Sequence, residues 1–131
     1  MIIEPPTKIV VKKSPIHGLG VFASKNILTG EVFEICPILD LPIAKGESSP
    51  LLIDYRFNWP SGMDFDKQVL ALGYASLYNH SNSANANWRS NININCFEFY
   101  ATQDINEGQE IFIYYGGVDY WNDGRLHTQV I

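Results

Sequence analysis

Short apolar segments rich in β-branched and aromatic residues, separated by glycine, proline and asparagine, recur along this chain of 131 residues. Such segments favour β-strands, and the residues between them favour tight turns. No β-α-β alternation occurs, and no glycine-rich phosphate loop follows a strand and opens a helix. The pattern predicts a mostly β domain with strands near residues 9–11, 21–23, 32–39, 51–59, 97–101 and 110–115.

Three features modify this prediction. Residues 67–78 have apolar spacing that favours a helix, which Gly73 makes short or irregular. Seven asparagines from Asn79 to Asn95 favour loops, because asparagine side chains bond their own backbone and tolerate left-handed angles. Pro37 lacks a backbone donor, so its strand is expected to be kinked or to lie at a sheet edge.

Charge and composition exclude several classes of protein. The net charge of −5 argues against direct nucleic-acid binding through phosphates. No apolar run approaches the ~20 residues of a membrane span, and residues 1–8 lack the features of a signal peptide. Cys36 and Cys96 form no C-x-x-C pair, so they predict neither a zinc site nor a disulfide framework. We expect a soluble intracellular protein with reduced, buried thiols and no membrane partner.

The charges are segregated along the chain. Residues 90–124 contain six acids and no lysine or arginine, whereas residues 8–25 contain four lysines and no acid. Two interpretations stay open at this point. The segments form two solvated faces, or the acids line a groove that takes a basic peptide.

Three short motifs stand out, and each is weak alone. Gly18–Ala23 contains a G-x-G turn between strands. Asn79–Asn85 begins with a glycosylation-type Asn-His-Ser and sets His80 beside a serine, but the chain shows neither a secretory signal nor a nucleophile elbow. Gly108–Gly116 is a polar turn leading into an apolar strand that ends in paired tyrosines, a pattern that also suits an ordinary core strand.

In this order and spacing, the motifs resemble those of the SET-domain protein lysine methyltransferases. That family has an early Gly-x-Gly, a central Asn-His-Ser-Cys-x-Pro-Asn and a late Gly-Glu-Glu-Leu-Thr-x-x-Tyr. The resemblance runs from Ile9 to Trp121 and includes Ala71–Tyr74 between the motifs. It implies a SET-domain fold, which is mostly β with several small sheets, a knot-like C-terminal crossing and one or two short helices.

The resemblance also divides the chain. Residues 1–8 are expected to form an N-terminal arm, residues 9–121 the SET domain, and residues 122–131 a C-terminal tail that closes the lysine channel. The chain has no coiled-coil heptad, so the oligomeric state stays open, a homodimer included.

Two departures from the family pattern agree with each other. Asn82 stands where many members have a zinc-binding cysteine, and Ala84 stands where they have proline. The cysteine-rich segment that completes the zinc cluster is also missing. The chain therefore resembles zinc-free members, such as the small SET proteins of large algal viruses, and no metal site is expected. A viral source would place the protein in the host nucleus or cytoplasm.

The resemblance implies S-adenosylmethionine as the cofactor and S-adenosylhomocysteine as its product. The candidate cofactor-binding residues are Gly18, Leu19, Gly20, Asn79, His80 and Tyr115. Glycine allows the backbone to approach the cofactor closely. Asn79 can offer both donors and acceptors to the amino-acid end, and the backbone of His80 can bond the adenine.

For the substrate lysine, the resemblance implies a narrow channel with the candidate walls Tyr55, Ile113, Tyr115, Tyr120 and Trp121. Aromatic walls cover the methylene stem and face the cationic head. Desolvation and the sulfonium charge favour loss of the ammonium proton before methyl transfer, so no carboxylate base is required. Glu110 is therefore expected to be structural or to bind the peptide.

Tyr115 matches the family's catalytic tyrosine, and Tyr55 is a second catalytic candidate. The Tyr115 hydroxyl can orient the amine and, together with carbonyl oxygens, stabilise the methyl group during transfer. Ile113 stands where members place an aromatic residue that tunes the number of methyl groups added. Its apolar side chain leaves room, which favours di- or trimethylation.

The expected substrate is a lysine in a basic protein segment, such as a histone H3 tail, which is the family's commonest target. Non-histone proteins stay open. Two rival interpretations also stay open: a degenerate SET fold that binds a peptide or cofactor without turnover, and a purely structural β domain.

Overall fold

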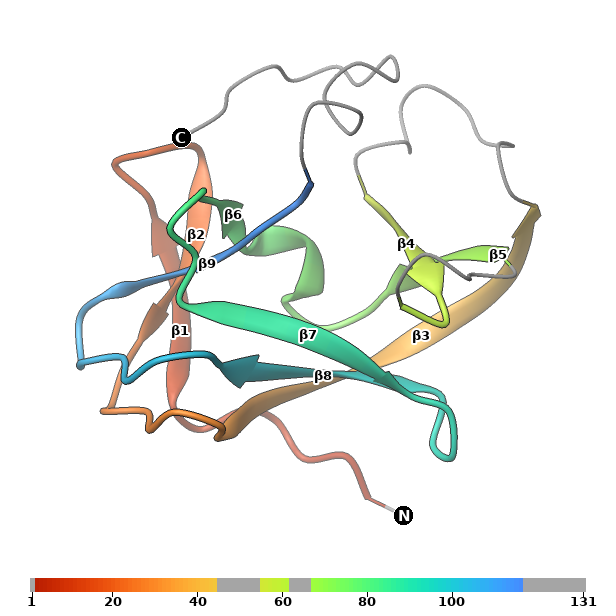
Figure 1. Ribbon diagram of the computed structural model, residues 1–131, viewed down its shortest axis with the longest axis horizontal. Helices are drawn as coiled ribbons and strands as arrows, with labels where there is room; N and C mark the ends of the chain where they lie inside the picture. The colour runs from red at the N-terminus through yellow and green to blue at the C-terminus, as the bar shows by residue number, and fades with distance from the viewer. Residues whose placement is uncertain (1, 45–54, 62–66, 117–131) are drawn as a thin grey trace.

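The computed structural model describes residues 2–44, 55–61 and 67–116, and within them the chain forms two sheets (Figure 1). The elements are β1 (Ile9–Lys13), β2 (Leu19–Ala23), β3 (Val32–Ala44), β4 (Arg56–Trp59), β5 (Lys67–Ala71), the 3-10 turn η1 (Ala75–Leu77), β6 (Asn79–His80), β7 (Ala86–Asn91), β8 (Cys96–Ala101) and β9 (Glu110–Ile113). The sheets have the orders β1-β2-β9-β6 and β4-β5-β3-β8-β7. The mostly β fold predicted from the sequence is confirmed.

The first sheet joins segments that are far apart in sequence. β9 pairs antiparallel with β2, where Val21 faces Ile111. On its other side β9 pairs parallel with β6, where Asn79 faces Phe112 and His80 faces Ile113. The late strand therefore lies between the early G-x-G strand and the central Asn-His segment, as Figure 1 shows.

β3 is the middle strand of the second sheet, so the prediction that Pro37 marks an edge strand is wrong. The first half of β3 pairs with β8 as far as Pro37, and the second half pairs with β5 from Ile38 onward. Pro37 stands where the partner changes, and its carbonyl accepts a hydrogen bond from the N–H of Leu72 at 2.8 Å. The missing N–H of proline is tolerated at this point because one ladder ends there and the other begins.

The helix predicted over residues 67–78 is also wrong. Residues Lys67–Ala71 form β5, which pairs with β3 on one side and β4 on the other, and Val69 is completely buried. Gly73 has φ +73°, a left-handed angle that interrupts any helix. Among the described residues, only the single turn η1 is helical. Pairing on both edges has outweighed the helical spacing.

The irregular stretch predicted over residues 79–95 is only partly correct. Residues Ala86–Asn91 form β7, in which Trp88 pairs with Phe99 of β8 and stacks on its ring at 6.2 Å. Packing of these aromatic rings overrides the loop preference of the neighbouring asparagines. The preference persists after β7, where the positive φ of Asn95, 52°, precedes β8.

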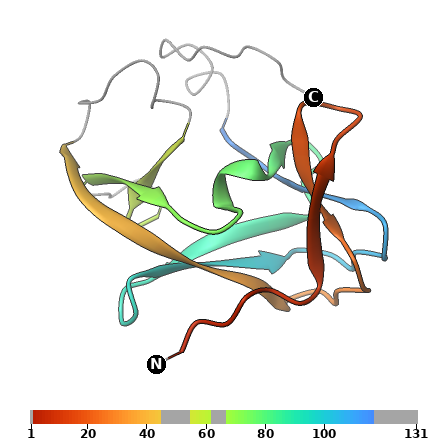
Figure 2. The same ribbon diagram turned by 180° about the vertical axis from the view of Figure 1, so that it is seen from behind.

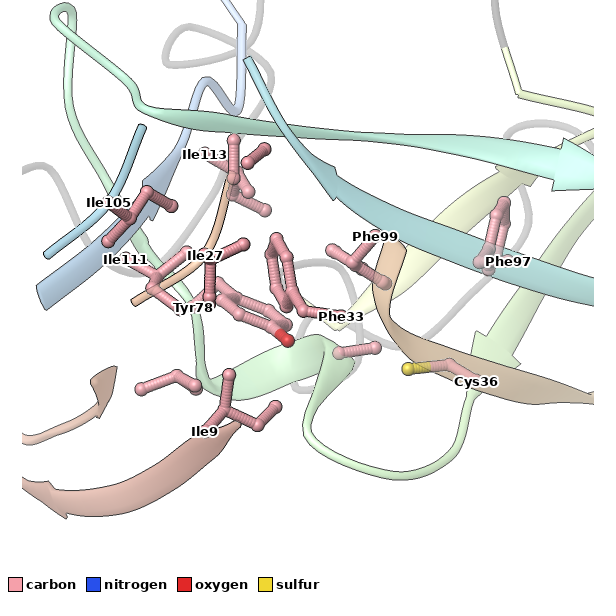
Figure 3. Close-up of a cluster of buried hydrophobic side chains, with 14 of the residues drawn as sticks. Ile9, Ile27, Phe33, Cys36, Tyr78, Phe97, Phe99, Ile105, Ile111 and Ile113 are labelled. Carbon is pink, nitrogen blue, oxygen red and sulfur yellow. The ribbon is translucent and has the colours of Figure 1, made fainter. Parts of the chain in front are cut away.

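Both sheets contribute to one core, in which Tyr78 lies at the centre (Figure 3). The Tyr78 ring is completely buried and stacks on Phe99 at 4.7 Å. Burial of such a side chain stabilises the fold by about 1.5–3 kcal/mol. Seen from behind, η1 lies between the two sheets (Figure 2), and the residues that follow it, Tyr78 to His80, are buried. Within the described residues, no helix is long and apolar enough to cross a bilayer.

Candidate active site

The pairing of β6 with β9 brings the central and late motifs together. The backbone N–H of Tyr115 donates to Nδ1 of His80 at 2.9 Å, and the Tyr115 hydroxyl donates to the backbone carbonyl of Tyr78. Tyr78 directly precedes Asn79 in the sequence. Tyr115 is thus held at two points beside Asn79 and His80, residues that lie about 35 positions earlier.

Asn79 is buried, and its side-chain amide is fixed by three acceptors. Nδ2 donates to the carbonyls of His17 at 3.1 Å and Leu19 at 3.2 Å, and to Oε2 of Glu110 at 2.8 Å. These acceptors settle which end of the amide is nitrogen, because an oxygen could not donate to any of them. From its amide chemistry, Asn79 was expected to offer a ligand both donors and acceptors. In the structure its amide hydrogens are used within the protein, which leaves Oδ1 as the group it can offer.

Glu110 is the buried acid behind Asn79. Besides the Asn79 amide, its carboxylate accepts the hydroxyl of Ser14, with oxygen–oxygen distances of 2.8 and 3.0 Å. None of the ion pairs within the described residues includes Glu110. Its negative charge is therefore balanced by dipoles rather than by a neighbouring cation, which favours a positively charged ligand group nearby. Sequence reasoning missed Ser14, for which the only signal was a Ser-Pro strand break.

Gly20 lies directly against the buried pair of Glu110 and Asn79. A Cβ at Gly20 would lie 2.4 Å from Oε2 of Glu110 and 3.1 Å from Nδ2 of Asn79. The space that glycine leaves is thus filled by this buried pair. Gly18, in contrast, has φ +47° and nothing within 4 Å of an added Cβ, so the turn conformation accounts for it. Leu19 between them is 53% exposed.

His80 is buried, and its hydrogen bonds assign its tautomer. Nδ1 accepts the N–H of Tyr115, so the neutral ring carries its proton on Nε2, which lies 3.2 Å from Oδ1 of Asn82. Asn82 is the residue that stands in place of the family's zinc-binding cysteine. In this chain it holds the histidine in the orientation that receives Tyr115. The rings of Tyr114 and Tyr115 lie 5.3 and 5.2 Å from the imidazole.

The candidate channel residues are distributed unevenly. Tyr115 is partly buried and packs against the core. Ile113 is 1% exposed and belongs to the core itself (Figure 3). Tyr55 is 51% exposed, and within the described residues no hydrogen bond or ring contact joins it to Tyr115. Tyr120 and Trp121 lie outside the described residues, as does the predicted C-terminal tail.

The two thiols are buried and free. Burial and the neighbouring Glu34 raise the pKa of Cys36, and burial raises the pKa of Cys96. Both groups are therefore held as neutral thiols, which are poor nucleophiles and poor metal ligands. In the part of the chain that the structure describes, no three histidine, cysteine or acidic side chains cluster as metal ligands would.

The described acids after residue 90 differ in their surroundings. Arg89 and Asn91 bond Glu98 and lower its pKa, and the backbone and hydroxyl of Thr29 bond Asp104 and lower its pKa. Glu110 is buried, whereas Glu107 is exposed. Asp119 and Asp123 lie outside the described residues. Glu98, Asp104 and Glu110 are thus each hydrogen-bonded to neighbouring groups of the protein.

Comparisons with known proteins agree with this geometry. The family model of the SET domain matches residues 18–116. The chain is 31% identical over 119 residues to a Schizosaccharomyces pombe protein named histone-lysine N-methyltransferase, H3 lysine-37 specific, and the match covers 83% of this chain and 78% of that protein.

Solved structures show the same relationship. A crystal structure of a candidate histone methyltransferase from Plasmodium falciparum is similar with a TM-score of 0.69 and 34% identity, over 87% of this chain and 96% of that one. The SET-domain histone lysine methyltransferase of Neurospora has a TM-score of 0.63 over 83% of this chain and 52% of that one. At 20% identity, this second likeness shows the fold alone.

Proposed function

The chain belongs to the SET-domain family, and from that premise we propose that it is a protein-lysine N-methyltransferase using S-adenosylmethionine. The observation that carries the proposal is the meeting of Asn79, His80 and Tyr115 across the β6–β9 pair. A purely structural domain has no need of a tyrosine anchored through both its backbone and its hydroxyl beside a buried asparagine and carboxylate.

The residues present fit the amino-acid end of the proposed cofactor. Oδ1 of Asn79 is an acceptor whose orientation is fixed by the three hydrogen bonds that Nδ2 of the same amide makes. Glu110 adds a buried negative charge behind it. Together they suit an ammonium group, which S-adenosylmethionine carries on its methionine portion. The exposed backbone at Gly18 and Leu19 and the backbone of His80 are the proposed further contacts.

The proposed chemistry is a single displacement. S-adenosylmethionine, when bound, supplies a methyl group on a positively charged sulfur. The neutral lysine amine forms the new N–C bond as the S–C bond breaks, which leaves S-adenosylhomocysteine and a methylated ammonium that later loses its proton to water. The substrate amine must first lose its own proton, and desolvation lowers the pKa of a lysine for this step.

Tyr115 and the carbonyl of Tyr78 are the proposed orienting groups. Because the Tyr115 hydroxyl donates its proton to that carbonyl, its oxygen would act towards the amine or the methyl group only as an acceptor. We assign Tyr115 as the catalytic residue. Tyr55, Tyr120 and Trp121 stay as proposed channel walls, and the apolar, non-aromatic side chain of Ile113 supports addition of two or three methyl groups.

The proposed substrate is a basic segment of an intracellular protein, with a histone H3 tail as the first candidate. Support comes from the relative in Schizosaccharomyces pombe, whose name specifies histone H3. A degenerate SET fold that binds a peptide or cofactor without turnover is the rival function. The intact anchoring of Tyr115 favours the enzyme over the binder, because a binder gains nothing from a positioned hydroxyl.

A methyl-transfer assay tests the proposal. The protein is incubated with isotope-labelled S-adenosylmethionine and core histones, H3 peptides or a cell lysate, and labelled lysines are located by mass spectrometry. We expect label on lysine with the wild type and almost none with Tyr115→Phe. Binding of S-adenosylhomocysteine by both proteins, with label transferred by neither, would instead establish the non-catalytic binder.

A further inference from the structure

A buried carboxylate that the proposed mechanism does not use lies beneath the catalytic tyrosine. Glu34, on β3, is 4% exposed. Its Oε1 accepts the hydroxyl of Tyr78 at 2.7 Å, and its Oε2 accepts the backbone N–H of Tyr74 at 2.9 Å. Within the described residues it takes part in no ion pair. Burying a carboxyl group in an apolar strand costs free energy unless the group is hydrogen-bonded.

The backbone is shaped around this carboxylate. Gly73 has φ +73°, and a Cβ there would lie 2.7 Å from Oε2 of Glu34 and 3.4 Å from Sγ of Cys36. The glycine thus lets the chain close directly on the acid before η1. This explains Gly73 and Tyr74, which lie in the Ala71–Tyr74 segment of the family resemblance and have no part in the proposed chemistry.

The bond between Tyr78 and Glu34 has a fixed direction. Burial and the charge of Glu34 raise the pKa of Tyr78 well above its ordinary value, so the tyrosine keeps its proton and donates it. The ring of Tyr78 also stacks on Phe99 at 4.7 Å and meets the edge of Phe33 at 6.0 Å. The side chain of Tyr78 is therefore held at its tip by Glu34 and along its ring by two aromatic side chains.

The other end of Tyr78 reaches the reaction site. Its backbone carbonyl accepts the hydroxyl of Tyr115, and its C-terminal neighbour is Asn79. Movement of the Tyr78 ring would therefore displace the carbonyl that orients Tyr115. Catalytic groups lose much of their effect when displaced by about 0.5–1 Å, so a clamp of this kind acts on turnover.

We propose that Glu34 is a positioning residue for methyl transfer, acting through Tyr78 on the hydroxyl of Tyr115. The inference rests on the proposed function. Glu34 touches neither Tyr115 nor the Asn79–Glu110 pair by any hydrogen bond within the described residues. It accordingly affects turnover far more than cofactor affinity, because the Asn79 amide is held separately by His17, Leu19 and Glu110.

Two variants and a control separate positioning from general stability. Glu34→Gln keeps the volume but turns one acceptor into a donor that faces another donor, and Tyr78→Phe keeps the ring and removes the hydroxyl. We expect each to lower kcat on the order of tenfold, while KM for the peptide and Kd for S-adenosylhomocysteine change by less than about twofold. The control is Phe97→Leu, which disturbs the core at Phe57 and Trp59, away from Tyr78.

A double-mutant cycle identifies the path. In a Tyr115→Phe background, Glu34→Gln and Tyr78→Phe should lower the residual kcat no further, because the group they position is gone. Additive losses, or losses equal to those of Phe97→Leu at equal stability, would overturn the inference. If Glu34→Gln does not fold, Tyr78→Phe carries the same comparison.

A readout without turnover keeps the inference separate from the proposed function. Fluorotyrosine is incorporated, and the Tyr115 fluorine resonance is assigned from its loss in Tyr115→Phe. Glu34→Gln should shift this resonance in the free protein, and Phe97→Leu should leave it in place. A shifted resonance in a protein that methylates no lysine would contradict the proposed function and support the coupling of Glu34 to Tyr115. An unchanged resonance in an active enzyme would overturn the coupling of Glu34 to Tyr115 and leave the proposed function intact.

Discussion

Among the described residues, the buried carboxylates are Glu34 on β3 and Glu110 on β9, and their surroundings are alike. Each accepts a side-chain hydroxyl and an N–H group, and each lies against a glycine that has no room for a Cβ. The glycine is Gly73 for the first acid and Gly20 for the second.

The two acids differ in the direction of their bonds. Glu110 holds the side chain of Asn79, whose Oδ1 is the proposed cofactor ligand. Glu34 holds the ring of Tyr78, whose carbonyl orients the proposed catalytic hydroxyl. In the proposed function, a buried acid packed on a glycine thus supports cofactor affinity through Asn79 in one network and turnover through Tyr78 in the other.

Removing the Tyr115 hydroxyl should give the largest effect. We expect Tyr115→Phe to lower kcat on the order of 100-fold, because one positioned polar group is lost at the reacting atoms. The affinity for S-adenosylhomocysteine should change by less than about threefold, since the backbone N–H of Tyr115 still bonds His80. Steady-state kinetics and calorimetry measure the two quantities. An equal loss of kcat and of affinity would contradict the separation of turnover from cofactor binding.

Neutralising Glu110 should give the opposite pattern. Glu110→Gln removes the buried charge and replaces one acceptor oxygen with an NH2 donor that faces other donors. The affinity for S-adenosylmethionine should therefore fall by roughly 10- to 100-fold, the range expected for a hydrogen bond to a charged group. At saturating cofactor, kcat should change by less than about threefold. Calorimetric titration of the variant checks the affinity. A variant with unchanged affinity and low kcat would place Glu110 on the catalytic side.

The site residues could be predicted from the sequence, whereas the buried carboxylate networks behind them could not. Asn79, His80 and Tyr115 were predicted from three motifs and their resemblance to a family, and the β6–β9 pair brings them together. Periodicity alone could not have placed them side by side, because the parallel pair joins residues more than 30 positions apart through a strand of two residues.

Other features had weak signals or misleading ones. Glu34 was visible as an acid inside an apolar strand, but nothing in the sequence identified Tyr78 as its partner. The spacing of residues 67–78 predicted a helix, and pairing on two edges made Lys67–Ala71 a strand instead. The role of Asn82 depended on the tautomer of His80, which only a three-dimensional hydrogen-bond network assigns.

Adding a methyl group to the glycines should distinguish contact from backbone strain. Gly73→Ala should destabilise the fold by about 1–3 kcal/mol, through a left-handed φ and a collision with Glu34. Gly108→Ala is the matched control, because Gly108 has φ +91° and open space around an added Cβ. Urea unfolding measures both variants. A larger loss of unfolding free energy in Gly73→Ala than in Gly108→Ala, together with a lower kcat, would report the collision with Glu34. Equal losses in the two variants would show that only backbone strain matters at Gly73.

Asn82 tests whether Tyr115 is also held from the His80 side. Asn82→Ala removes the acceptor of Nε2–H, so the imidazole loses one of the contacts that orient it and holds the Tyr115 backbone N–H less precisely. One neutral hydrogen bond is worth about 0.5–1.5 kcal/mol, so we expect kcat to fall by about two- to tenfold. Asn82→Asp, which keeps the acceptor, should retain most of the rate. A larger loss in Asn82→Asp than in Asn82→Ala would contradict this assignment.

Glu98 sets the lower limit of the comparison, because its carboxylate is bonded like the other two but lies at the surface. It pairs with Arg89 at 2.8 Å, and its pKa is lowered, first by that bond and then by Asn91. A lowered folded-state pKa stabilises the protein above the ordinary glutamate pKa, and the contribution disappears as the pH falls through the folded-state value. Glu98→Gln should therefore reduce the free energy of unfolding by at most about 1 kcal/mol at pH 7, and the difference from wild type should shrink as the pH falls below about 4. Urea unfolding at several pH values measures it, with kcat and cofactor affinity expected to stay at wild-type values. A loss of either activity or affinity in Glu98→Gln would mean that carboxylates affect this enzyme through the general field rather than through the two buried networks.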